Sequence, residues 1–203
     1  MKKYAVLHEP GDIVTLAGTR FVVLDVERRG SLPDSLFLLV LESVGTSEFG
    51  SSNNYAESDL KKAVDKWLED MDKRGLDNAK LIPRKIDLTT LDGSGCYGKL
   101  SVKAAPLTLD EAREYADIIP NAERWCWLAT GWSGPSKSDG DLALYVLSNG
   151  VWYNGNCSNS RGIRPALKAP SILFEDSEAG LDLSKIPTDD LLQEIHRRLA
   201  EKA

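Results

Sequence analysis

Residues 35–41, Ser-Leu-Phe-Leu-Leu-Val-Leu, restrict the possible folds more than any other part of the chain, because they form a continuous apolar run of strand length. Such a run is typical of a strand that is buried on both faces. Two further segments, residues 13–16 and 20–26, precede it and are separated by a turn at Gly18. The N-terminal part of the chain therefore predicts β structure with a hairpin-like pair and an interior strand.

Helical patterns follow this β-rich part. Ser58 is placed to cap a helix over residues 59–73, and Gly75 would end it. The apolar face of this helix is predicted to carry Leu60, Val64, Trp67, Leu68 and Met71. Thr108 and Glu111 have the spacing of a capping box, which predicts a second helix over residues 109–118 that stops before Pro120.

The length of 203 residues predicts one main domain with a small appendage. We expect the domain over residues 1–168, a proline-containing linker over 169–187, and a helix over 188–203. This last helix begins with a Thr cap and has one narrow apolar stripe. So short a helix is not stable alone, so it either docks on its own domain or serves as an assembly handle.

Composition excludes several classes of function. A net charge of −6 argues against nucleic-acid binding, which needs a basic surface. No apolar run is long enough to insert into a membrane, and the basic N-terminus lacks the apolar core of a signal peptide. We therefore expect synthesis in a cytoplasm, which also fits association with a virion such as a phage tail.

Catalytic and metal-binding residues are scarce. The histidines, His8 and His196, lie near opposite ends of the chain, which disfavours both histidine-based catalysis and a zinc site. Cys96, Cys126 and Cys157 include no close pair and predict separate free thiols. We expect a non-enzymatic protein with no metal and no cofactor.

The segment between Trp132 and Arg161 instead resembles a recognition surface. Residues 142–147 and 151–153 predict a hairpin around an Asn-Gly turn, followed by a polar stretch over 154–161. If Leu144, Val146 and Val151 face the core, alternation turns Tyr145, Leu147 and Trp152 outward. Aromatic and arginine side chains supply contact area, while Ser, Asn and Gly adapt to a ligand. The predicted ligand-binding residues are Trp132, Ser133, Tyr145, Leu147, Ser148, Asn149, Trp152, Tyr153, Asn154, Asn156, Cys157, Ser158, Asn159, Ser160 and Arg161.

Two sequence motifs bracket this segment. Residues 125–128 are Trp-Cys-Trp-Leu, and residues 162–167 are Gly-Ile-Arg-Pro-Ala-Leu. Together with residues 11–16, 21–25 and 55–60, they resemble a bacterial and phage domain of C-type lectin fold over about residues 10–168. The resemblance implies an α+β domain with small antiparallel sheets, two flanking helices, and pairing of its N- and C-terminal strands.

Many domains of this kind are variable proteins of diversity-generating retroelements. In those systems adenines of a template are copied with errors, so that Asn codons change into codons for residues such as Tyr, Ser, Gly, Cys, Arg and Leu. Most of the predicted ligand-binding residues belong to that set, whereas Trp132 and Trp152 do not. The resemblance implies receptor recognition, with a protein or glycan on a target cell or particle as the partner.

The chain departs from the family in two respects. Residues 129–131 are Ala-Thr-Gly where related segments often have Arg-Ser-Pro. The Glu-Pro-Asn and Trp-Asn-Asp motifs of calcium-dependent sugar binding are absent from this region, so a lectin fold does not imply sugar binding here.

Two alternatives remain open. A virion or tail structural protein would bury residues 132–161 in a stable oligomer. An enzyme related to the formylglycine-generating branch of the fold would need Cys126 and Cys157 as a reactive pair, with Cα atoms within about 7 Å.

Overall fold

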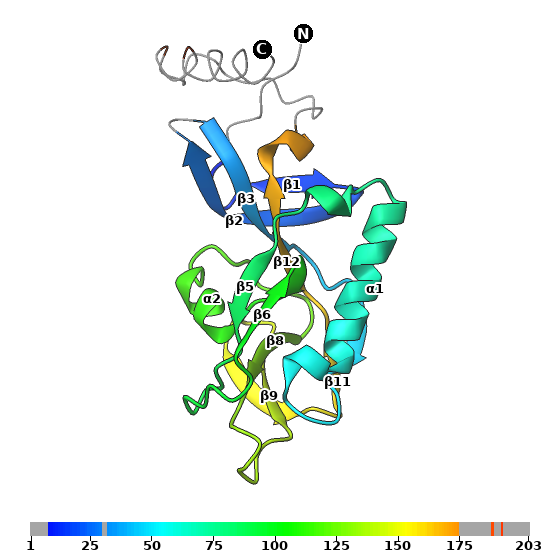
Figure 1. Ribbon diagram of the computed structural model, residues 1–203, viewed down its shortest axis with the longest axis vertical. Helices are drawn as coiled ribbons and strands as arrows, with labels where there is room; N and C mark the ends of the chain where they lie inside the picture. Colours follow the sequence, from blue (N-terminus) through cyan, green and yellow to red (C-terminus); the bar gives the residue numbers. More distant parts are fainter. Residues whose placement is uncertain (1–7, 30–31, 175–187, 189–191, 193–203) are drawn as a thin grey trace.

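The computed structural model describes residues 8–29 and 32–174, together with positions 188 and 192. Over these residues the chain has an α+β fold made of short, mostly antiparallel strands and two α-helices (Figure 1). Two five-stranded sheets and one two-stranded sheet are present in this part of the chain. The predicted α+β class with small antiparallel sheets is confirmed.

The first sheet joins the two ends of the domain. Its strand order is β1-β2-β3-β12-β7, with every neighbouring pair antiparallel. The strands are β1 (Ile13–Leu16), β2 (Thr19–Arg29), β3 (Leu32–Val40), β12 (Pro165–Pro170) and β7 (Ala104–Pro106). Pairing of β12 with β3 confirms the expected association of N- and C-terminal strands.

Strand β3 contains the apolar run except for Leu41, which directly follows it. Leu38 and Leu39 are both buried, and they belong to different hydrophobic clusters on the two faces of the sheet. Both faces of the sheet are covered by other elements at this strand, so successive residues of the strand must all be apolar. The predicted interior strand is confirmed.

The second sheet carries most of the predicted binding segment. Its order is β10-β9-β8-β11-β4, comprising β10 (Trp152–Asn156), β9 (Leu142–Val146), β8 (Cys126–Gly131), β11 (Ser160–Gly162) and β4 (Thr46–Glu48). The hairpin around the Asn-Gly turn is confirmed as β9 and β10. Within the polar stretch 154–161, β10 extends to Asn156 and β11 begins at Ser160. A separate hairpin consists of β5 (Arg84–Asp87) and β6 (Lys99–Val102).

The helices begin where their capping residues predict. Ser58 Oγ accepts a hydrogen bond from the Lys61 N–H at the start of α1 (Asp59–Lys73). The capping box is complete at α2 (Leu109–Glu114). Helix α2 is shorter than the predicted 109–118, because after Tyr115 the backbone continues in turns toward Pro120. Short 3₁₀ segments are η1 (Tyr55–Glu57), η2 (Asn78–Lys80) and η3 (Ser171–Phe174).

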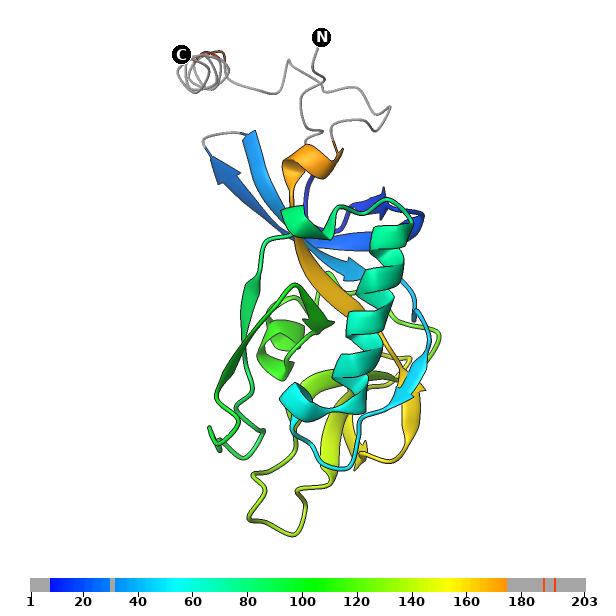
Figure 2. The ribbon, with the colours of Figure 1, turned by 45° about the vertical axis from the view of Figure 1, so that its right-hand side comes forward.

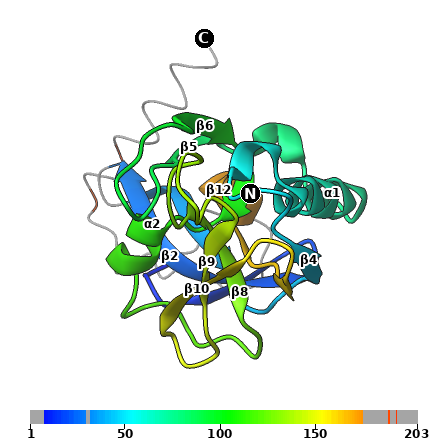
Figure 3. The ribbon, with the colours of Figure 1, turned by 90° about the horizontal axis from the view of Figure 1, so that it is seen from below.

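The two α-helices cover different sides of the molecule. Helix α1 runs lengthwise along one side (Figure 2), and the view from below places α2 on the other side of the sheets (Figure 3). The apolar face of α1 is buried as predicted, except that Leu68 is only partly buried. In α2, Leu109 and Ala112 complete the second hydrophobic cluster.

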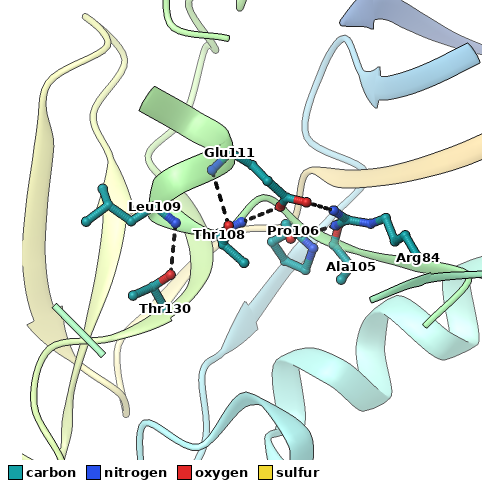
Figure 4. A network of polar contacts seen from close by, with 7 residues as sticks. All are labelled: Arg84, Ala105, Pro106, Thr108, Leu109, Glu111 and Thr130. Carbon is teal, nitrogen blue, oxygen red and sulfur yellow. Dashed lines mark hydrogen bonds and ion pairs between the residues drawn. The ribbon is translucent and has the colours of Figure 1, made fainter. Parts of the chain in front are cut away.

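A polar network fixes α2 against the β5 strand (Figure 4). The buried Arg84 guanidinium pairs with the Glu111 carboxylate and donates to the carbonyls of Ala105 and Pro106, at 2.9 and 3.0 Å. Glu111 also accepts from the Thr108 N–H, so one carboxylate serves both the capping box and the ion pair. This arrangement ties the start of α2 to two other elements.

The domain extends beyond the predicted boundary at residue 168. Strand β12 continues to Pro170, and η3 follows directly. Phe174 is buried and lies edge-on to His8, with ring centroids 5.8 Å apart. The expectation of a linker from residue 169 is therefore wrong at its start. The rest of the linker, residues 175–187, and the predicted helix over 188–203 lie outside the described residues, apart from positions 188 and 192.

Candidate functional site

The β9–β10 hairpin positions the aromatic side chains of the predicted binding segment. Its turn closes with hydrogen bonds from Leu147 N to Val151 O and from Gly150 N to Leu147 O, at 2.8 and 3.0 Å. Gly150 has a φ of 83°, a left-handed conformation that favours glycine. The turn fixes the register, in which Tyr153 lies opposite Tyr145 and Trp152 lies opposite Val146.

Because successive side chains alternate, the second sheet presents two different surfaces. On one face, Tyr153 and Tyr145 lie with ring centroids 6.1 Å apart. On the other face Trp152 approaches α2, and the Arg113 guanidinium lies 5.5 Å from its ring centroid. The residues predicted as one surface are thus divided between the two faces of the sheet.

Arg161 is the centre of the first surface. Its guanidinium carbon lies 3.5 Å from the Tyr145 ring centroid, 5.0 Å from that of Trp127 and 5.4 Å from that of Trp125. A cation over aromatic faces is attracted by the ring quadrupoles. We call Trp125, Tyr145, Tyr153 and Arg161 the Arg161 cluster.

Glycine at position 155 makes this cluster possible. A Cβ built on Gly155 would lie 2.5 Å from Arg161 Nη2 and 3.1 Å from the Tyr145 ring. Arg161 is partly buried, and desolvation lowers its pKa. Its Nε is buried without a hydrogen-bond partner. The arginine is held in place by its contacts with the aromatic rings and by a side-chain hydrogen bond with Tyr145.

Two aromatic side chains of the Arg161 cluster remain open to solvent. Trp125 is 49% exposed and Tyr153 is 59% exposed, although each packs one side against Tyr145. Large exposed aromatics beside a fixed arginine have the composition of binding hot spots. The depression between Trp125, Arg161 and Ser160 has a volume of about 320 Å³.

Most of the other predicted residues are accessible. Exposed positions are Ser148, Asn149, Trp152, Tyr153, Asn156, Ser158, Asn159 and Ser160, and partly buried ones are Trp132, Leu147, Asn154 and Arg161. Asn156 has a structural role, because its side chain donates to Asp141 and accepts from the N–H and hydroxyl of Ser158. On the α2 side, Trp132, Trp152 and Asn154 line a shallow depression.

Three predicted site residues are buried: Tyr145, Cys157 and Ser133 are 5%, 1% and 3% exposed. Leu144 faces the core as expected, but the expectation that Tyr145 faces outward is wrong, because β9 is covered on both sides and both residues are buried. Val151, expected to face the core, is 51% exposed in the hairpin turn. Alternation separates core from surface only when one face of the sheet is open to water.

The cysteines are free in the described part of the chain. Burial raises the pKa of Cys126 to about 11 and that of Cys157 to about 12. A nucleophilic cysteine requires a lowered pKa, so neither thiol has the environment of a reactive group. Among the described residues, no cluster of three or more His, Cys, Asp or Glu side chains is arranged to hold a metal ion.

Sequence reasoning missed Trp125, Arg113 and Arg164 as candidate functional residues. Trp125 directly precedes β8, and no local pattern shows that its ring is exposed. Arg164 did carry a signal, because a charged residue lies within the otherwise uncharged stretch 162–167. It is buried, 7% exposed, and lines a cavity between α2 and the hairpin.

Comparison with known proteins gives no match to any family model, curated protein or solved structure. In the part of the chain that is described, no helix has the length and apolar character to span a membrane.

Proposed function

We propose that this chain is a non-catalytic recognition protein that binds its ligand through the Arg161 cluster and the neighbouring turns. The observation that carries the proposal is the exposure of Trp125 and Tyr153 around a fixed arginine. Exposed aromatic rings that are already packed on one side lose little conformational entropy on binding.

The position of this surface supports a display role. The sheet that carries the Arg161 cluster lies at the lower end of the molecule in Figure 1, and η3 lies at the upper end. His8 and Phe174, the first and last residues of the two described stretches 8–29 and 32–174, are in contact. Attachment at these ends would leave the opposite end free to meet a protein or glycan on a target surface.

The finer proposal is a C-type lectin-like variable protein of a diversity-generating retroelement. It is supported by the pairing of β12 with the N-terminal sheet and by the second sheet that carries the 132–161 segment. It is also supported by the exposure of Ser148, Asn149 and Ser158–Ser160, where substitutions would leave the core intact. Tyr145 and Cys157 are less suited to variation because they are buried.

The DNA flanking the gene tests the diversification. We expect a near-copy of codons 132–167 that differs mainly at adenines, near a gene for a reverse transcriptase. Differences should fall on codons of exposed residues and spare those of Tyr145 and Cys157. Absence of any such copy would contradict diversification but would leave a fixed recognition surface in place.

A second experiment separates recognition from the structural alternative. A tail protein that uses this face for assembly would sediment as a stable oligomer that Tyr153→Arg disperses. A recognition protein would keep the same sedimentation coefficient in wild type and Tyr153→Arg. Ile13→Arg is the matched control, because Ile13 is 49% exposed on β1 in the other five-stranded sheet. The enzyme alternative is disfavoured by the raised pKa values of Cys126 and Cys157.

A further inference from the structure

An apolar cavity of about 340 Å³ lies between the hairpin and the segment that follows α2. Its buried lining includes Leu107, Ala112 and Leu128, whereas Ala116, Val151 and Trp152 are exposed at its rim. This volume falls in the range of small-molecule sites in proteins, about 300–1,000 Å³. The cavity is formed on the α2 side of the sheet, whereas the Arg161 cluster lies on the other face.

The one charged side chain in the lining is Arg164. Its Nε donates to the Val40 carbonyl at 2.8 Å, and its Nη1 donates to the Pro120 carbonyl at 3.0 Å. Its Nη2 is buried and has no hydrogen-bond partner. The two carbonyl contacts fix the guanidinium, and its third nitrogen has no acceptor among the described residues.

No carboxylate among the described residues forms an ion pair with Arg164, and the cavity lining contains neither Asp nor Glu. Glu42, an acidic group that acts on Arg164 from a distance, is exposed and pairs with Arg20 at 2.9 Å. A buried cation without a paired anion is costly, and so is a buried donor without an acceptor. An anionic ligand group beside Arg164 would relieve both costs.

We propose that this cavity binds a small monocarboxylate with an apolar body. The carboxylate accepts a hydrogen bond from the Arg164 guanidinium in the cavity lining, and the body packs against Ala112, Leu128 and Val146. An apolar cavity of about 150 Å³ holds one benzene ring, so a cavity of about 340 Å³ accommodates a ligand of about a dozen non-hydrogen atoms. A single guanidinium among apolar walls suits a carboxylate better than a phosphate, which has more oxygen atoms to satisfy.

Isothermal titration calorimetry with 4-phenylbutyrate tests the proposal, with 4-phenyl-1-butanol as the uncharged ligand of nearly the same shape. We expect saturable binding of the acid with a Kd of about 1 mM or tighter. The affinity of the alcohol should be lower by about tenfold or more, because the alcohol lacks the charge-assisted hydrogen bond. Equal affinity for acid and alcohol, or no saturable binding of the acid, would overturn the proposal.

Two variants locate the binding. Ala116→Phe places a large side chain at the rim and should weaken 4-phenylbutyrate binding about tenfold or more, whereas Ala79→Phe on the exposed η2 should leave it unchanged. Arg164→Lys keeps the charge but loses the fork geometry, so it should remove most of the preference for acid over alcohol. Unchanged binding in Ala116→Phe would overturn the proposed location even if Arg164→Lys fails to fold. Because the Arg161 cluster lies on the other face, neither result depends on the proposed recognition function.

Discussion

Replacing Arg84 by Met tests whether the network in Figure 4 determines the position of α2. Met preserves much of the apolar stem but removes the guanidinium, which leaves Glu111 without its ion-pair partner. Removing one partner of a fully buried ion pair costs about 3–5 kcal/mol. The Glu111 side chain is 24% exposed and keeps the Thr108 N–H, so the expected loss in unfolding free energy is smaller, about 2–3 kcal/mol.

The coupling between the two residues provides a sharper measurement. Glu111→Gln retains a side chain that can complete the capping box but removes the charge, and we expect it to cost about 1–2 kcal/mol. Because the side chains are in direct contact, the double variant should lose less than the sum, with a coupling of about 1 kcal/mol or more. Urea unfolding followed by circular dichroism measures all three free energies.

The matched control is Arg20→Met, which removes an exposed arginine from a surface ion pair with Glu42. Such pairs contribute about 0–1 kcal/mol, so this variant should be almost as stable as wild type. If Arg84→Met is no more costly than Arg20→Met, or if the Arg84 and Glu111 changes add without coupling, the network does not hold α2 as argued.

Three further predictions concern the binding segment, a buried thiol and a helix cap. Tyr145→Ala should cost about 3–5 kcal/mol in urea unfolding because Tyr145 is buried, whereas Tyr153→Ala should cost about 1 kcal/mol or less; similar losses would contradict the assigned burial. Unfolded Cys157 ionises above about pH 8.5 while burial holds its folded pKa at about 12, so this thiol should lower stability by about 1–2 kcal/mol between pH 8 and 10, in addition to a similar contribution from Cys126, and Cys157→Ala should remove that part of the fall. An equally steep fall in that variant would exclude the thiol as a cause. Thr108→Ala should lower the unfolding free energy by about 1 kcal/mol through loss of the capping box, and an unchanged midpoint would refute that role.

Local patterns predicted the elements whose signals lie within a few neighbouring residues. Ser58 and Thr108 identified both helix starts, because a capping oxygen bonds to amides only a few positions away. The Asn-Gly pair identified the β9–β10 turn for the same reason. The C-terminal limit of the domain was missed, because burial of Phe174 against His8 depends on residues far apart in the sequence.

For the candidate site, too, some features were evident from the sequence and others depended on the tertiary structure. The sequence alone determined that the segment between Trp132 and Arg161 is rich in aromatic and small polar residues, and that little other chemistry competes with it. Only the tertiary structure decided which of these side chains reach solvent. Alternation places Tyr145 and Leu144 on opposite faces, but it does not specify that both faces are covered by other elements. The structure also brought Trp125 to Arg161 and Arg164 to the cavity beside α2, because strands β8, β9, β11 and β12 assemble from separate parts of the chain. Contacts between distant segments depend on the packing of whole sheets, and no short stretch of sequence contains that information.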